Sequence, residues 1–429
     1  MVEKSTGFNY HAFMDEYLPR IVDSEVSRAI GVSGALLIEG ARAVGKSATA
    51  RQHARSELRL DSTDPLAVLA REMPSVALGG EAPRLLDEHQ LIPGLWNEVR
   101  HAVDDRQKPG QFLLTGSASP SEDPYRHSGA GRFRHVMMRT MAFVETSHSS
   151  GDVSLRALLG GSSPTVTQSE LEFRDVIGRI VSGGWPGWRD VPEEDAQQNI
   201  ISYLDDISQH VFPQVAGVRR DPRRLVAFVR AMASFTAQSA SFAAMTRRVD
   251  EDSTTSIGHA SIPELHDFAS RMYLTEDQPA WSPQLRSRTA AIQTPKRHLC
   301  DPSLAAALLG AGTDRLLLEP TTLGFLFESQ VVHDLRVFAQ ACGARGVFHY
   351  RDEKGRDEID AVVEANDGSW LAVEVKLGKA AIDTAAANLL RVTAKMVRPP
   401  VACVVVVPVG IAHQRADGVY VVPLTTLGP

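Results

Sequence analysis

The chain has 429 residues, of which 43% are hydrophobic and 23% are charged. This is the composition of a globular protein, and it excludes disordered and fibrous classes. The 45 Lys and Arg residues against 52 Asp and Glu residues give a net charge of −7. That balance excludes a protein that is basic throughout, so any contact with nucleic acid has to come from a local basic patch.

The length, at about 150 residues per domain, and the pattern of apolar residues predict three domains. Short apolar runs alternate with helical stretches from about residue 33 to 147, the pattern is mostly helical from 152 to 288, and strands return from 294. Alternating strands and helices are typical of a parallel sheet with crossover helices. We therefore predict an α/β fold with domains over residues 1–150, 165–290 and 294–429.

Nothing in the chain resembles a targeting or membrane segment. Residues 1–10 lack the apolar core of a signal peptide. The most apolar run, residues 401–408, is far shorter than the roughly 20 residues that a membrane span needs. The three cysteines, Cys300, Cys342 and Cys403, form no CxxC pair and fit a reducing compartment. We expect a cytoplasmic protein without a membrane partner.

A phosphate-binding loop is the most specific motif. Residues 40–47 read Gly-Ala-Arg-Ala-Val-Gly-Lys-Ser and match G-x-x-x-x-G-K-[ST] between a predicted strand and a predicted helix, the context that this motif requires. Backbone N–H groups and the helix N-terminus should hold phosphates, Lys46 should reach the β- and γ-phosphates, and Ser47 should bind Mg²⁺. The predicted ATP-binding residues here are Gly40, Ala41, Arg42, Ala43, Val44, Gly45, Lys46, Ser47 and Ala48.

Two acids end a short apolar strand about 40 residues after this loop. An acidic pair at the end of a strand is usually part of a solvated turn, but its spacing from a phosphate loop favours a Walker B motif. We therefore predict that Asp87 holds Mg²⁺ and that Glu88 acts as the general base for the attacking water.

Two further positions follow the next predicted strand, which ends at Leu114. Ser117, in Thr-Gly-Ser, could sense the γ-phosphate or could simply satisfy the backbone of a glycine turn, and both interpretations stay open. Arg132 ends a glycine-rich loop. It could contact the nucleotide of its own or of a neighbouring subunit in a homo-oligomer, or it could be a solvated surface arginine.

The series GARAVGKS, LLDEHQ, FLLTGSAS and GAGRF resembles an AAA-type P-loop ATPase family whose ATPase domain is followed by a domain of unknown function. Asp61, Gln90 and the segment Gly183-Gly-Trp-Pro186 carry the resemblance further. The resemblance implies Mg²⁺-dependent hydrolysis of ATP. His89 departs from the family, which usually has an apolar residue there. This departure bears on the packing of the Walker B strand and not on the chemistry.

The middle region is locally basic, with 12 Lys and Arg against 8 Asp and Glu between residues 215 and 300. Helices predicted over 221–237, 241–248 and 262–273 are typical of a helix-turn-helix or winged-helix unit. Such a unit could bind nucleic acid, or it could be a helical lid with solvated arginines. The candidates for phosphate contacts are Arg219, Arg220, Arg223, Arg224, Arg247 and Arg248.

The C-terminal region carries acids on a predicted hairpin. If residues 366–368 form a three-residue loop, the register places Asp360 opposite Glu374. Two opposed carboxylates repel each other unless a positive group lies between them. We expect both, with Lys376, on the solvent-facing side of the hairpin. We expect Ile359, Ala361 and Val363 to share the buried side with apolar residues of the second strand.

Asp360, Glu374 and Lys376 are similar to the PD-(D/E)xK signature of restriction-endonuclease-like folds. The resemblance implies that the two acids hold a second Mg²⁺ or Mn²⁺, with Lys376 as a catalytic residue. Glu328 is the best fourth member, because a carboxylate on the apolar face of a predicted helix is costly unless it is paired or metal-bound. Ile359 stands where the signature has proline. A simple salt-bridged hairpin is the alternative.

These patterns predict an ATPase coupled to the binding or processing of nucleic acid, with DNA favoured, and with a metal-dependent nuclease domain whose activity stays open. The alternative is a regulatory NTPase switch in which the nuclease-like fold is an inactive binding module.

Overall fold

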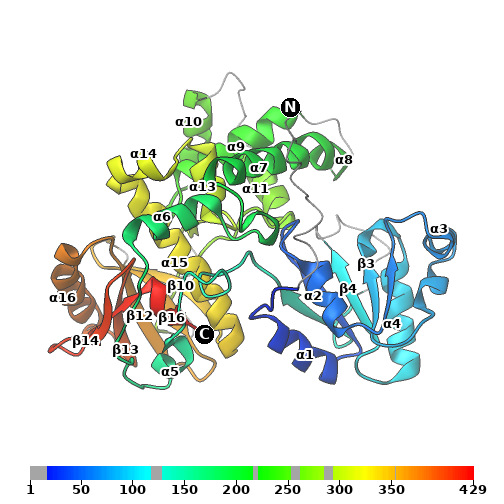
Figure 1. The fold of residues 1–429 in the computed structure, drawn as a ribbon, viewed down its shortest axis with the longest axis horizontal. Helices are drawn as coiled ribbons and strands as arrows, with labels where there is room; N and C mark the ends of the chain where they lie inside the picture. The colour runs from blue at the N-terminus through cyan, green and yellow to red at the C-terminus, as the bar shows by residue number, and fades with distance from the viewer. Residues whose placement is uncertain (1–16, 117–127, 216–220, 253–260, 285–292, 353) are drawn as a thin grey trace, which may run out of the picture.

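The computed structural model describes residues 17–116, 128–215, 221–252, 261–284, 293–352 and 354–429. Ser117, Arg219 and Arg220 lie outside the described residues. Three parts are visible in Figure 1: a P-loop sheet domain at the right, a helical part at the top and a second sheet at the lower left. No helix in these ranges is both long and apolar enough to cross a membrane.

The first part is the predicted parallel sheet with crossover helices. Its five strands are all parallel and have the order β2-β3-β4-β1-β5. Their bounds are β1 Ala35–Glu39, β2 Ser56–Arg59, β3 Arg84–Asp87, β4 Phe112–Gly116 and β5 Phe133–Met137, and the helices are α1 Asp23–Val32, α2 Lys46–His53, α3 Pro65–Glu72 and α4 Leu95–Arg106.

Both faces of this sheet are buried, which explains why its strands read as continuous apolar runs. Alternate residues of a strand point to opposite faces. Leu36 and Ile38 pack in the large core that continues into the other two parts, whereas Leu37 packs with α3 and α4 in a separate cluster. The sheet therefore has one face joined to the rest of the molecule.

The helical part contains the three helices predicted in the basic region, with somewhat shifted ends. Its helices are α6 Phe173–Ser182, α7 Glu193–Asp206, α8 Phe212–Val215, α9 Pro222–Ser234, α10 Phe242–Asp252 and α11 Ser261–Arg271, with a π-helical turn at Ile207–Val211.

Two further helices, α13 Pro302–Leu308 and α14 Thr313–Leu318, also belong to the helical part. α13 packs on α6, α7 and α9, and α14 packs on α6. Both helices lie after residue 294, in the range that the sequence predicts for the C-terminal domain. In the structure they pack on the helical part instead.

A small antiparallel arrangement completes the helical part. Strand β8 (Gln238–Ser239) pairs with β9 (Lys296–Arg297), and the extended segment 275–278 pairs with residues 296–299 on the other side. This segment also reaches the C-terminal sheet, because the Gln278 side chain donates to the Asp360 carbonyl at 3.1 Å. The small arrangement therefore touches two parts of the molecule.

The C-terminal sheet has seven strands in the order β10-β11-β12-β13-β15-β14-β7. The bounds are β7 Thr167–Gln168, β10 Gly346–Arg351, β11 Glu358–Glu364, β12 Trp370–Val375, β13 Ala402–Val407, β14 Ile411–Gln414 and β15 Tyr420–Pro423. Helix α16 (Ile382–Thr393) covers one face and α15 (Pro320–Cys342) lies on the other.

Residues 153–168, which precede the helical part in the chain, also pack here. They form β6 (Val153–Ser154), α5 (Leu155–Leu159) and β7, and β6 pairs with β16 (Leu427–Gly428). The chain therefore passes from the first sheet to the C-terminal sheet before it enters the helical part.

Helix α15 lies beside the C-terminal sheet and packs on α6, α13 and α14 of the helical part (Figure 1). It carries buried polar side chains, including Asp334, which accepts from the Phe143 backbone N–H at 3.0 Å, and His333, which lies 2.9 Å from the Thr140 hydroxyl. Since Thr140 and Phe143 follow β5, this helix ties the first sheet to the C-terminal one.

Candidate nucleotide site and C-terminal acid cluster

The phosphate loop joins β1 to α2 in a conformation that glycine makes possible. Gly45, at the N-cap of α2, has φ +98°. Gly40 has φ +152°, and a Cβ there would lie 2.0 Å from the Met138 carbonyl oxygen. Glycine is therefore required at Gly40 by the close approach of another chain segment, and at Gly45 by its left-handed backbone. The N-terminus of α2 points into the middle of the loop. The free N–H groups and partial positive charge of a helix N-terminus favour the binding of an anion there.

Lys46 is folded back onto this loop. Its ammonium group donates to the carbonyl oxygens of Gly40 at 3.0 Å and Ala41 at 2.7 Å. Burial lowers the pKa of Lys46 to about 8, against the attraction of Glu88 and Asp87. Phosphate oxygens that replaced the two carbonyl partners would favour the charged form.

The Walker B strand meets the loop through oxygen atoms. The Ser47 hydroxyl donates to Asp87 Oδ1 at 2.6 Å, and the Thr115 hydroxyl, at the end of β4, donates to the same oxygen at 2.5 Å. A hydroxyl beside a carboxylate is a hard-oxygen donor set of the kind that Mg²⁺ prefers. Ser47 and Asp87 therefore fit the predicted Mg²⁺ ligands.

Glu88 follows directly in a left-handed conformation with φ +58°, uncommon for a residue with a side chain. Its backbone N–H donates to the Thr115 hydroxyl at 3.3 Å, and the Gln90 amide donates to its carboxylate. Such strain is a feature of functional sites. Thr115 thus orients both acids, whereas the sequence pattern singled out Ser117.

His89 is buried beneath the same edge of the sheet. Its Nδ1 lies 2.9 Å from the Thr115 carbonyl oxygen, and its ring lies 6.2 Å from that of Trp96. The imidazole thus takes the place of an apolar side chain and adds a polar contact to the strand that carries Thr115.

The structure places Arg132 at the wrong end of the sheet for contact with its own nucleotide. Arg132 immediately precedes β5, which is parallel to β1, so it lies at the edge where the strands begin. The phosphate loop follows the other end of β1. Arg132 pairs there with Asp104 at 2.8 Å. A finger within the same chain is therefore excluded by topology, and contact with a neighbouring subunit stays a prediction.

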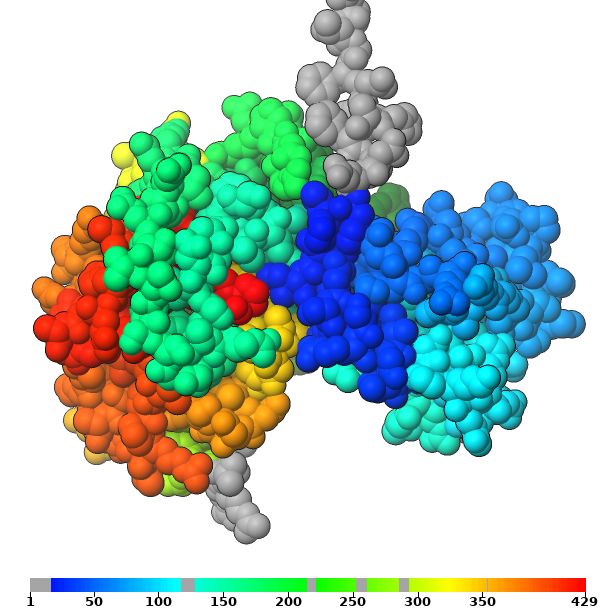
Figure 2. Space-filling view, turned by 60° about the horizontal axis from the view of Figure 1, so that its bottom comes forward, coloured from blue at the N-terminus to red at the C-terminus, as the bar shows by residue number. Residues whose placement is uncertain are grey.

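Residues from outside the sheet support the phosphate loop. The buried Arg20 donates to the Val44 carbonyl oxygen at 2.8 Å, to the Arg139 carbonyl oxygen at 2.9 Å, and to Glu145 at 2.9 Å. Figure 2 shows the N-terminal residues between the sheet domain and the rest of the molecule. The sequence held no periodic signal for Arg20, which precedes α1 and acts through tertiary contacts.

The helical part also touches the phosphate loop. Arg42 lies 3.7 Å from Asp206, the last residue of α7, and a Cβ on Gly45 would lie 3.8 Å from the Pro186 ring. Pro186 belongs to the Gly-Gly-Trp-Pro segment that carried the family resemblance. This segment is far from the phosphate loop in the sequence but packs next to it in the structure.

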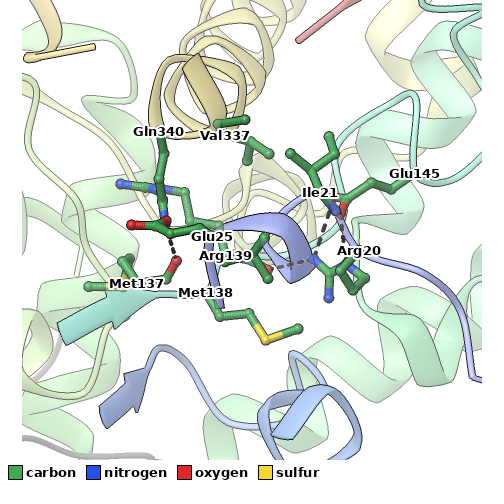
Figure 3. A pocket seen from close by; sticks show the side chains of 11 residues that line it. Arg20, Ile21, Glu25, Met137, Met138, Arg139, Glu145, Val337 and Gln340 are labelled. Carbon is green, nitrogen blue, oxygen red and sulfur yellow. Dashed lines mark hydrogen bonds and ion pairs between the residues drawn. The ribbon is translucent and has the colours of Figure 1, made fainter. Parts of the chain in front are cut away.

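Beyond Arg139 the contacts reach α15 (Figure 3). Arg139 donates to Glu276 at 2.6 and 2.8 Å and to the Gln340 side chain at 2.5 Å, and Gln340 in turn donates to the Met137 carbonyl oxygen at 2.8 Å. Although burial opposes its charge, Arg139 and Arg336 hold the pKa of Glu276 below its usual range. The surrounding residues enclose a cavity of about 20 Å³, room for about one water molecule.

The C-terminal hairpin has the predicted register. The Ala365 N–H donates to the Ser369 carbonyl at 2.8 Å, Gly368 has φ +82°, and Ala361 pairs with Val373. Asp360 and Glu374 therefore face one another at the next position. Lys376 contacts both, Glu374 at 2.9 Å and Asp360 at 3.6 Å.

Two details of the hairpin prediction are wrong. Asp360 and Glu374 are 9% and 8% exposed rather than solvent-facing, because the sheet is covered on both faces. Ile359 packs with Val362 and Trp370 and not with Val363. The register of β10 and β11 shifts by one residue between Phe348 and Tyr350, and such a bulge re-aims a side chain.

A second lysine, which the sequence pattern did not indicate, lies among these acids. Lys296 of β9 is 2.7 Å from Glu328, 2.9 Å from Glu358 and 3.4 Å from Asp360. Glu328, on α15, thus joins the cluster as predicted. Within the described ranges, however, no three His, Cys, Asp or Glu side chains are arranged to hold a metal ion. The second metal site thus stays a proposal.

Burial and repulsion shift the pKa values of the cluster. They raise the pKa of Glu328 to about 8 and that of Glu374 to about 7, with Asp360 as the main negative neighbour in both cases. Burial opposes the charge of Lys296, but Glu328, Asp360 and Glu358 outweigh it and raise its pKa. Lys296 and Lys376 likewise outweigh burial at Asp360 and lower its pKa. Burial and the neighbouring Asp360 therefore make Glu328 and Glu374 easier to protonate than exposed glutamates.

The arginines predicted to bind phosphates do not form one uniform surface. Arg247 is exposed, and Arg223 is exposed beside Asp221, at 3.2 Å. Arg224 is partly buried, and Arg248 lies 3.9 Å from Glu251. The outer face of α11 is acidic, with Glu264 and Asp267 exposed.

Comparisons with known proteins agree with the division into parts. Residues 32–147 match the family model of an AAA domain, residues 173–315 match a domain of unknown function (DUF8612), and residues 323–427 match another (DUF4143). The first match and the phosphate-loop geometry define an AAA-type P-loop ATPase domain. The second match ends beyond α13, in accord with its packing on α6, α7 and α9.

Two uncharacterized proteins, Mb2031c of Mycobacterium bovis and Rv2008c of Mycobacterium tuberculosis, are each 27% identical over 359 residues, which cover 82% of this chain and 72% of theirs. Among solved structures, the Walker-type ATPase paby2304 of Pyrococcus abyssi is 15% identical, with a TM-score of 0.38 over 67% of this chain and 94% of its own. This last likeness is too distant to define the fold.

Proposed function

We propose that this protein hydrolyses ATP with Mg²⁺ and that its nucleotide state changes how the ATPase domain holds the other two parts. The proposed hydrolysis rests on one observation: the hydroxyl oxygens of Ser47 and Thr115 meet the Asp87 carboxylate at the N-terminus of α2. An AAA-type domain supports the same assignment.

In this mechanism the loop backbone and Lys46 hold the phosphates of ATP. Glu88 takes the proton of a water whose oxygen attacks the γ-phosphorus, and the bond to the β-phosphate oxygen of ADP breaks. Ser47 and Asp87 would hold Mg²⁺, which neutralises phosphate charge when it is bound. Thr115 keeps Asp87 and the Glu88 backbone in register.

The second half rests on contacts that begin at the loop itself. Arg20 joins the Val44 carbonyl to the Arg139 carbonyl, and the Arg139 side chain binds Glu276 and Gln340. Gln340 and Glu328 lie on one helix, 12 residues and about 18 Å apart. A shift of the loop on nucleotide binding is therefore transmitted to a rigid helix that also carries Glu328 of the acid cluster.

Phosphate release tests the proposed activity. We expect turnover of ATP with Mg²⁺ and a fall to background when EDTA removes the metal, because the phosphate charge is then left to Lys46 alone. Restoring turnover with excess Mg²⁺ is the control for damage by the chelator. Turnover that persists in EDTA would contradict the proposed roles of Ser47 and Asp87.

Nucleic acid is the partner that we propose for the helical part. The order of elements from α9 to β9 supports a winged-helix-like unit. It is a helix, a short strand, two helices, an extended segment and a second short strand. Because the outer face of α11 is acidic, we assign the phosphate contacts to the exposed Arg223 and Arg247 instead.

Salt dependence tests these contacts. Each neutralised phosphate releases counterions, so replacing both Arg223 and Arg247 by alanine should reduce the slope of log K against log salt by roughly two for duplex DNA. Arg55→Ala, an exposed arginine of the ATPase domain, is the matched control and should leave the slope unchanged. An equal slope in the double variant would move the contact surface elsewhere.

A metal-dependent nuclease is a second candidate function. Asp360, Glu374 and Lys376 lie together as the PD-(D/E)xK resemblance requires, and Glu328 joins them from α15. The buried position of Lys296 among these acids favours the alternative, an inactive binding module, for the conformation described here.

A further inference from the structure

The acid cluster already contains a cation of its own. Lys296 is 3% exposed, and its ammonium nitrogen has Glu328, Glu358 and Asp360 oxygens at 2.7, 2.9 and 3.4 Å, contributed by α15 and β11. An ammonium group surrounded by three carboxylates occupies the point on which those carboxylates converge. A cation with oxygen ligands would have to occupy the same point.

Carboxyl groups outnumber lysines in the cluster. Four carboxylates, those of Glu328, Glu358, Asp360 and Glu374, face two lysines, Lys296 and Lys376. Glu374 Oε2 is buried and accepts no hydrogen bond from any described residue. A buried carboxylate oxygen without a donor is costly. The cluster therefore has one ligand position that its lysines do not satisfy.

Lys296 comes from another part of the molecule. On β9 it points into the acid cluster, whereas the next residue, Arg297, points the other way, where it donates to the Ala240 carbonyl at 3.0 Å, pairs with Asp277 and lies over the Phe242 ring. Neighbouring residues of a strand point to opposite sides. The two residues thus fasten the helical part to the C-terminal sheet.

We propose that Lys296 is a built-in substitute for a divalent cation: its ammonium group contacts Glu328 and Asp360 and keeps a cation out of the site that these two carboxylates share with Glu374. The inference concerns the same cluster as the proposed nuclease function and rests on that proposal for the identity of the ligands. It does not require cleavage.

Mn²⁺ binding tests the proposal. The probe is Mn²⁺ alone, followed by the electron paramagnetic resonance of the free ion, with nucleotide-free full-length protein. We expect Lys296→Met to bind one Mn²⁺ per chain more than the wild type, at least tenfold more tightly than any such site in the wild type, and to lose it when Asp360→Asn is added. Lys379→Met, an exposed lysine of the same part of the chain, is the control and should match the wild type.

Removing a buried ammonium group could unfold the protein, so a second variant is needed. Lys296→Met combined with Glu358→Gln removes one charge of each sign and leaves the three proposed ligands in place. Circular dichroism identifies the folded variant to use. Equal Mn²⁺ binding in the wild type and the folded variant would overturn the proposal.

A cleavage assay on duplex DNA with the same proteins separates the two proposals. Additional Mn²⁺ in the Lys296 variant without cleavage supports the substitution by Lys296 and counts against the nuclease. Wild-type protein that binds an Asp360-dependent Mn²⁺ and cleaves DNA overturns the role of Lys296 and supports the nuclease.

Discussion

Lys46→Ala is expected to lower ATP turnover at least about 100-fold, the size of effect seen when one fixed donor to a developing charge is removed. The side chain is the buried cation of the phosphate loop, held in place by the Gly40 and Ala41 carbonyls until phosphate oxygens replace them. ATP affinity should fall as well, because the interaction is present in the bound ground state and in the transition state. Phosphate release and a nucleotide-binding titration measure the two effects.

Lys108→Ala provides the matched control, since Lys108 is an exposed lysine of the same domain. It should leave both quantities unchanged. If Lys46→Ala kept more than half of the wild-type turnover, the phosphate loop would not be the site of hydrolysis.

Glu88→Gln is expected to separate ATP binding from hydrolysis. An amide has the shape of the carboxylate but cannot accept the proton of the attacking water, so turnover should fall by about 10² to 10⁴ while ATP binding is retained. Glu81→Gln, an exposed acid just before the same strand, should behave as the wild type. Undiminished turnover in Glu88→Gln would remove this residue from the mechanism and leave its left-handed backbone without a catalytic explanation.

Local patterns predicted the elements of the site well where the motif is continuous in the chain. The strand, glycine loop and helix around Lys46 follow from eight consecutive residues. The register of Asp360 against Glu374 follows from the three-residue loop before Ser369. The position of Arg132 could also have been predicted. Arg132 comes just before a strand that is parallel to β1, whereas the phosphate loop comes just after β1, so the two lie at opposite ends of the sheet.

Other contacts had no local signal. Lys296 contacts Asp360, 64 residues further along the chain, and Arg20 contacts Val44, 24 residues further along. Neither Lys296 nor Arg20 belongs to a periodic pattern that would indicate its partner. The cover of α16 over the hairpin was missed for a similar reason. Strand alternation says which side chains share a face but not what packs on that face.

The central claim is that the nucleotide state of the loop reaches α15, and hydrogen exchange of the Glu88→Gln protein with and without ATP and Mg²⁺ tests it most directly. This variant should hold ATP long enough for exchange to be followed. The account predicts altered protection both around residues 40–48 and in α15 near Gln340, because Arg20 and Arg139 join the two regions. Changes confined to residues 32–147, with the amides of α15 exchanging at the same rates in both states, would contradict it.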